Sequence, residues 1–140
     1  MLNKYNKMDY LYHGSTTQNI KILEPRHRYS PAGEIEYEAI YATPLKAYAV
    51  AHSFPWSSDE GVDLDVVNGE VLFTVPEDFR ERLQIPISIY TISAENFEHT
   101  KEEETGYTWH TTKPIPVIEE EKIQTVEDAL RKYGVKLMYK

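Results

Sequence analysis

The chain has 140 residues, of which 41% are apolar, and a formal net charge of −8. This length and composition predict a single folded domain over residues 1–140 and exclude a disordered chain. The acidic balance argues against a nucleic-acid partner, because phosphate binding needs clustered Lys and Arg. The absence of cysteine excludes disulfides, thiolate metal sites and a cysteine nucleophile.

The N-terminal region, residues 1–10, is polar, and no stretch of the chain is long and apolar enough to span a bilayer. We therefore expect neither a signal peptide nor a membrane partner. The lack of cysteine is compatible with a reducing compartment. The expected location is cytoplasmic.

Three segments are predicted before residue 39. The apolar run Tyr10–His13 is typical of a strand. The hydroxyl side chains of residues 15–17 are expected to cap a helical turn over Gln18–Ile22, which ends before Pro25 because the residue preceding proline avoids the helical region. Arg26–Glu38 has little periodicity and is predicted as a loop, and it begins with the densest basic cluster in the chain.

A strand and then a helix are predicted beyond this loop. Ala39–Ala42 is a short apolar run, and Thr43 with Pro44 after it makes a favourable helix start. Apolar and aromatic residues then recur every three to four positions, which predicts a helix over Leu45–Phe54 with one inward face. That face consists of Leu45, Tyr48, Ala49 and His52.

The second half of the chain is predicted to be rich in strands. Ser57–Asp65 is an expected loop, and Pro76–Leu83 an expected turn or short helix. Thr125 is expected to cap a last helix over Val126–Tyr133, which Gly134 ends. The expected strands are Glu70–Val75, Ile87–Ile92, Tyr107–Thr111, Ile115–Glu119 and Val135–Tyr139. Many short strands and a few short helices predict an α+β fold with a mostly antiparallel sheet.

Motifs for metals and common nucleotide sites are absent. The histidines show no HxH or HExxH spacing, and the acidic runs at residues 102–104 and 119–121 are typical of solvated faces. No metal is therefore expected. The chain also lacks GxGxxG, GxxxxGK[ST] and GxSxG, which argues against Rossmann, P-loop and nucleophile-elbow sites.

The tripeptide His13-Gly14-Ser15 lies at the end of the first expected strand, and alone it is a common turn pattern. Together with two later stretches, it makes the chain resemble the ADP-ribosyltransferase fold, in the branch of diphtheria toxin and the poly(ADP-ribose) polymerases. The resemblance rests on LYHGST leading through NIKILEP, on IYATPLKAYAVAHSF, and on the late hairpin GYTWHTTKPIPV. It implies an ADP-ribosyltransferase-like split antiparallel sheet with a few short helices.

The resemblance also implies a cleft that binds NAD as substrate. His13 would hydrogen-bond a ribose hydroxyl, and the backbone of Gly14 would clamp the nicotinamide amide, where a Cβ would block close approach. Ser15 would bind the ribose or cap the next turn. Tyr41 would stack on the nicotinamide ring, whose positive charge an aromatic face attracts. His13 and Tyr41 are thus the candidate catalytic residues.

Two further elements of the family, a pyrophosphate contact and a glutamate, correspond less directly to residues of this chain. Arg26 or Arg28 could meet the pyrophosphate through charge-assisted hydrogen bonds. The family glutamate, which polarises the ribose and stabilises an oxocarbenium-like transition state, aligns with Thr108, and a threonine cannot supply that negative charge. Glu104 lies just upstream and Glu119 well downstream, and neither matches cleanly.

The resemblance is compatible with several functions. The first is an enzyme, a mono-ADP-ribosyltransferase with a protein acceptor or a related NAD-cleaving activity without a metal. The second, which Thr108 favours, is a catalytically inactive module that binds NAD, ADP-ribose or a protein. An accessory protein on the same scaffold is a third, since fold does not fix function. The RNA 2′-phosphotransferases share the fold, but their basic surface is missing here.

Ordinary structural roles remain open for the same residues. His13 could be a core histidine at a strand end, and Tyr41 one of many packed tyrosines. Arg26 and Arg28 could pair with the surplus carboxylates.

Overall fold

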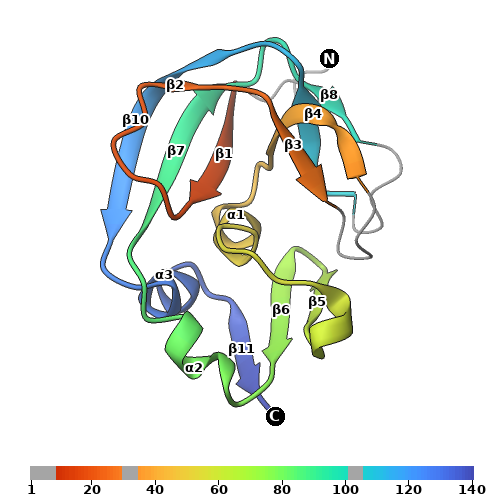
Figure 1. Ribbon diagram of the computed structural model, residues 1–140, viewed down its shortest axis with the longest axis vertical. Helices are drawn as coiled ribbons and strands as arrows, with labels where there is room; N and C mark the ends of the chain where they lie inside the picture. The colour runs from red at the N-terminus through yellow and green to blue at the C-terminus, as the bar shows by residue number, and fades with distance from the viewer. Residues whose placement is uncertain (1–8, 30–34, 101–105) are drawn as a thin grey trace.

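The structure is a computed structural model that describes residues 9–29, 35–100 and 106–140. Within these ranges the strands alternate with a few short helices (Figure 1). The strands are β1 (Tyr10–Ser15), β2 (Ile22–Leu23), β3 (Arg26–Tyr29), β4 (Ile35–Ala42), β5 (Asp63–Val67), β6 (Glu70–Val75), β7 (Ile87–Ser93), β8 (Glu98–His99), β9 (Trp109–Thr111), β10 (Ile115–Ile123) and β11 (Lys136–Tyr139). The helices are α1 (Lys46–Ala51), the 3-10 turn η2 (Ser58–Glu60), α2 (Phe79–Arg82) and α3 (Val126–Lys132).

The described strands form three sheets, in the orders β1-β7-β10-β2, β3-β4-β9-β8 and β11-β6-β5. Every pair is antiparallel except β11 with β6, which is parallel. The fold is therefore α+β with mostly antiparallel sheets, as the sequence predicts. In Figure 1 the two four-stranded sheets occupy the upper half, the three-stranded sheet the lower half, and α1 the centre.

Two apolar clusters hold these layers together. In the larger one, α1 packs against α3, β6 and β7 around fully buried side chains such as Phe73, Ile89 and Leu130. The smaller one lies between the two four-stranded sheets and includes Leu11 of β1 and Ile40 of β4. Burial of such side chains is the main stabilising contribution to the fold. No helix in the described ranges is long and apolar enough to cross a membrane.

Several predicted elements are confirmed by the structure. The predicted strand Tyr10–His13 continues as β1, and the predicted strand Glu70–Val75 coincides with β6. At the start of α3, the Thr125 hydroxyl accepts a hydrogen bond from the Asp128 amide at 2.9 Å. Gly134 follows this helix with a φ of +77°, the left-handed conformation that glycine adopts without strain.

Other predicted elements are wrong, and tertiary contacts explain the clearest case. Gln18–Ile22 forms no helical turn, because the Tyr90 hydroxyl accepts from the Ile20 amide at 3.2 Å and donates to the Thr17 carbonyl at 2.6 Å. These bonds from a distant strand replace the local ones of a helix. The predicted loop Arg26–Glu38 contains β3 and the start of β4, which pair with each other.

The predicted helix after β4 and the predicted loop after it also differ from the structure. The helix expected over Leu45–Phe54 spans only Lys46–Ala51, and Leu45 rather than Thr43 is its N-cap residue. The expected loop Ser57–Asp65 contains η2 and the start of β5. The errors at α1 and at β5 fall at element ends, where capping and packing compete and sequence patterns are weakest. The 3-10 turn η2 lies inside the predicted loop and is missed altogether.

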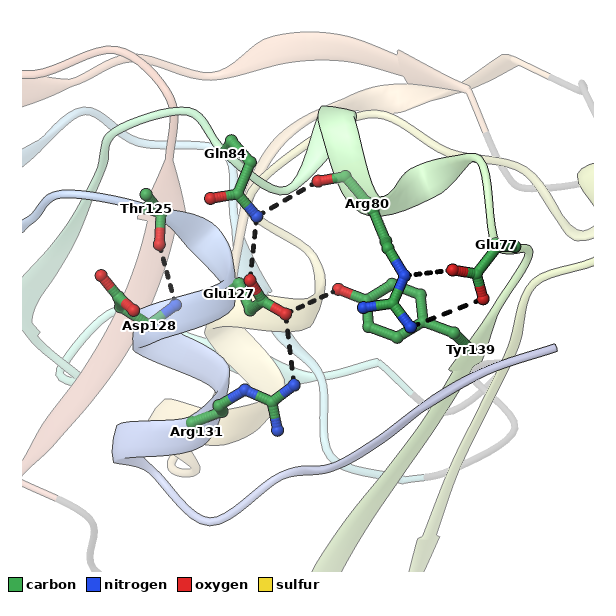
Figure 2. Close-up of polar contacts among 8 residues, drawn as sticks. All are labelled: Glu77, Arg80, Gln84, Thr125, Glu127, Asp128, Arg131 and Tyr139. Carbon is green, nitrogen blue, oxygen red and sulfur yellow. Dashed lines mark hydrogen bonds and ion pairs between the residues drawn. The ribbon is translucent and has the colours of Figure 1, made fainter.

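A polar network fastens the C-terminal strand β11 to α2 and α3 (Figure 2). The Glu127 carboxylate accepts from Gln84 Nε2 at 2.9 Å, from the Tyr139 hydroxyl at 3.0 Å and from Arg131 at 3.2 Å. The Arg80 guanidinium lies 3.8 Å from the centroid of the Tyr139 ring. The hydrogen bond from Gln84, followed by those from Tyr139 and Arg131, lowers the pKa of Glu127, whereas burial and the Glu127 contact raise the pKa of Tyr139 to about 12.

Replacement of Tyr139 by Phe is expected to make the unfolding free energy less sensitive to alkaline pH. The folded pKa of about 12 exceeds the value of about 10 for an unfolded tyrosine. The neutral side chain therefore stabilises the fold fully below about pH 10, and this contribution is lost as the pH rises through about 12. Urea unfolding across this range measures the difference between wild type and Y139F, with the exposed Tyr10→Phe as control. An identical alkaline loss in wild type and Y139F would contradict the prediction.

Candidate functional site

The two four-stranded sheets meet where β1 runs beside the end of β4. One isolated bridge joins them: the Tyr12 amide donates to the Thr43 carbonyl at 2.8 Å, and the Thr43 amide to the Tyr12 carbonyl at 3.0 Å. The His13 side chain adds a second link, because its Nδ1 lies 2.7 Å from the Tyr41 carbonyl oxygen. A carbonyl only accepts, so Nδ1 is the donor, and in the neutral ring Nε2 carries the lone pair.

Strand alternation directs the polar backbone of Gly14 toward the same side as this bridge. The amide and carbonyl of Tyr12 face β4, since both bond to Thr43. Successive residues of a strand alternate in direction, so the amide and carbonyl of Gly14 also point away from β7 and toward the β4 side. Gly14 therefore presents one donor and one acceptor at the edge of β1.

A cavity of about 620 Å³ opens at this edge, a size within the range of small-molecule sites of roughly 300–1,000 Å³. Of the residues that the sequence predicts for cofactor binding, five line this cavity. They are His13, Gly14, Ser15, Tyr41 and Thr108.

The remaining predicted residue, Arg26, is only partly located. Its main chain lies on β3 opposite Ala39, and Ala39 itself lines the cavity. The side chains of Arg26 and Arg28 lie outside what the structure describes. The predicted pyrophosphate contact therefore stays a prediction.

Helix α1 and the turn after it supply an aromatic wall that the sequence patterns do not assign to the site. Tyr48, His52 and Trp56 line the cavity. Their rings form a chain, with 4.6 Å between the Tyr48 and His52 centroids and 5.6 Å between those of His52 and Trp56. The Trp56 indole donates to the Ala51 carbonyl at 2.8 Å. The four-residue spacing of these rings is a usable signal, but a face of this kind is equally typical of a core.

Lys46 anchors the first turn of α1 over β1 and α3. Its ammonium lies 5.1 Å from the Tyr12 ring centroid, 5.2 Å from the Tyr133 ring centroid and 3.6 Å from the Glu121 carboxylate. Burial opposes the charged form, yet the contacts with Tyr133 and Glu121 raise the pKa of Lys46. The cation thus links the first turn of α1 to β1 and to the end of α3.

Charge is scarce among the described residues that line the cavity. Glu24, which is exposed, is the single carboxylate among them. Thr108 is 7% exposed, and its carbonyl accepts from the Thr100 amide at 2.9 Å. Glu119 lies on β10, two strands away from β1, and Glu104 lies outside the described residues. The walls can thus hold an uncharged or aromatic group but offer little to a developing cation.

Comparisons of this chain with protein-family models, with curated proteins and with solved structures find no match. The cavity itself is therefore the basis for a functional assignment.

Close packing of α1 is a sufficient reason for a glycine at position 14. A Cβ built there would lie well inside van der Waals contact of the Ala49 carbonyl oxygen and 2.9 Å from Ser53 Cβ. Helix α1 therefore rests directly on the backbone of β1. The family resemblance explains this glycine by a ligand, whereas the structure supplies a packing reason of its own.

Replacement of Gly14 by Ala is expected to destabilise the fold by about 1–3 kcal/mol, because the added methyl group meets backbone rather than a flexible side chain. The unfolding free energy in urea measures the effect. Thr16→Ala, on the exposed residue just after β1, is the control and should change little. A Gly14→Ala chain as stable as the control would contradict the packing of α1 on β1.

Proposed function

We propose that the cavity between β1, β4 and α1 binds NAD, and that the chain is ADP-ribosyltransferase-like. The observation that carries the proposal is that His13, Gly14, Tyr41 and Thr108, selected from the sequence, line one cavity. His13 and Tyr41 are also joined by a hydrogen bond of 2.7 Å. Two four-stranded sheets that meet at one isolated bridge support the split-sheet fold that the resemblance implies.

The chemistry of the lining fits a nicotinamide riboside. The amide and carbonyl of Gly14 face the cavity side of β1 and match the acceptor and donor of a carboxamide. The Tyr41 ring would stack on the pyridinium. His13 and Ser15 would hydrogen-bond the ribose hydroxyls, and Arg26 or Arg28 would meet the pyrophosphate.

The reaction we propose is mono-ADP-ribosyl transfer or NAD cleavage. The bond between ribose C1′ and the nicotinamide nitrogen breaks, and its electron pair leaves with neutral nicotinamide. A nucleophile, from a protein acceptor or from water, then adds to C1′ and loses its proton. The ribose carries positive charge in the transition state, which a nearby carboxylate stabilises strongly.

A second candidate is binding of NAD or ADP-ribose without turnover. It is favoured by Thr108, which is neutral and stands where the resemblance expects the family glutamate. The single described carboxylate of the lining, Glu24, is exposed, and water screens its charge. The same cavity then recognises the ligand but lacks the group that lowers the barrier.

Wild-type protein is expected to bind NAD in isothermal titration calorimetry and to melt at a higher temperature in its presence. Loss of the Tyr41 ring in Tyr41→Ala should raise the Kd about 2- to 30-fold, corresponding to roughly 0.5–2 kcal/mol of stacking. His13→Ala should also raise it. Tyr10→Ala, on an exposed tyrosine of the same strand as His13, is the control. No heat and no melting shift at millimolar NAD would refute the proposed site.

Replacement of Thr108 by Glu is expected to increase the release of nicotinamide from NAD about 100-fold, because it adds a charge where the cation develops. Nicotinamide is quantified by chromatography, and Thr108→Gln is the control of similar size without charge. Measurable release by the wild type would eliminate the binding-only candidate. A Thr108→Glu chain that binds NAD yet cleaves no faster than Thr108→Gln would contradict the proposed reaction geometry.

A further inference from the structure

The segment from residue 17 to residue 20 forms one wall of the cavity without being a helix or a strand. Thr17 and Ile20 line the cavity. Between them Asn19 has a φ of +67°, a left-handed conformation that a non-glycine residue adopts at some cost. Such a segment keeps one conformation only if contacts with the rest of the fold hold it.

A carboxylate from β10 supplies the first of these contacts. Glu120 Oε2 accepts the Asn19 amide at 2.9 Å and the Ser88 hydroxyl at 2.6 Å. Lys122 Nζ then donates to the Asn19 side-chain oxygen at 2.6 Å. The backbone amide and the side-chain oxygen of Asn19 are therefore both bonded to residues of β10.

Tyr90 of β7 supplies the second contact, because its hydroxyl bonds to backbone groups before and after Asn19. The Tyr90 hydroxyl donates to the Thr17 carbonyl at 2.6 Å and accepts from the Ile20 amide at 3.2 Å. Tyr90 and Ser88 are both fully buried. Polar groups buried in this way cost free energy when they lose their partners, so the bonded conformation is strongly preferred.

We propose that Glu120 and Tyr90 are positioning residues of the NAD site, which hold residues 17–20 as a fixed wall of the cavity. The inference rests on the proposed function, because it concerns the affinity of the same cavity. Neither residue lines the cavity. Both act by keeping the binding-competent conformation of the segment populated, and a ligand binds more weakly in proportion to any loss of that population.

The charge of Glu120 supports this role. Burial opposes ionisation, but hydrogen bonds from Asn19 and Ser88 and the nearby ammonium of Lys122 lower the pKa of Glu120. The other titratable group against it is the hydroxyl of Tyr90. The ionised carboxylate accepts hydrogen bonds only, which suits the two donors that meet it.

Amide hydrogen exchange tests the wall directly. The amide of Asn19 in Glu120→Ala, and the amide of Ile20 in Tyr90→Phe, should exchange about ten times faster than in the wild type, because that amide has lost its acceptor. Amides of β6 should stay unchanged. Tyr90→Phe keeps the ring in the core, so it still tests the wall if Glu120→Ala unfolds. Glu119→Ala, on the exposed neighbour in β10, is the control.

Calorimetric titration with NAD tests the link to the site. If the wall is intact for about a tenth of the time, the Kd of both variants rises about tenfold. Glu120→Gln keeps an oxygen acceptor and should recover part of the affinity. Faster exchange with an unchanged Kd, or unchanged exchange, would overturn the positioning role alone. A wild type that fails to bind NAD would instead refute the proposed function, and this inference with it.

Discussion

The short junction of β1 with β4 sets both the arrangement of the sheets and the opening beside them. One bridge between Tyr12 and Thr43, with the His13 side chain bonded to the Tyr41 carbonyl, connects the two four-stranded sheets directly. A full ladder would have closed the space between the strands and consumed the edge groups of Gly14. A single bridge joins the sheets and leaves a cavity beside the joint. The limited pairing of β1 with β4 thus accounts both for the link between the sheets and for the cavity beside it.

Helix α1 packs against the junction of β1 with β4 and forms part of the cavity wall. It begins at Lys46, just after Thr43, and rests on the backbone of β1 because Gly14 has no side chain. The rings of Tyr48 and His52 then become cavity wall rather than core alone. The side chains that pack this helix against its surroundings therefore also line the cavity.

The described lining of the cavity offers more groups for hydrogen bonding and stacking than charged groups. It combines the backbone edge of Gly14, an imidazole and several aromatic faces, and the proposed binding of NAD rests on these groups. The position next to β9 holds Thr108, which can donate or accept a hydrogen bond but carries no charge. The proposed cleavage of NAD needs a negative charge beside the ribose, which Thr108 does not supply, whereas the proposed binding does not need it.

Local patterns in the chain are enough to predict the α+β class, most strands and several of the residues that gather at the cavity. These patterns are apolar runs, the Thr125 cap, and the His13-Gly14 and Tyr41 motifs. The path of residues 17–20, by contrast, is a product of the tertiary fold, since Tyr90 and Glu120, far away in the chain, replace the bonds of the expected helical turn. Sequence patterns reflect the conformational preference of neighbouring residues. The hydrogen-bond partners of this segment lie on β7 and β10, which are distant in sequence and reach it only through the pairing of strands in the folded protein.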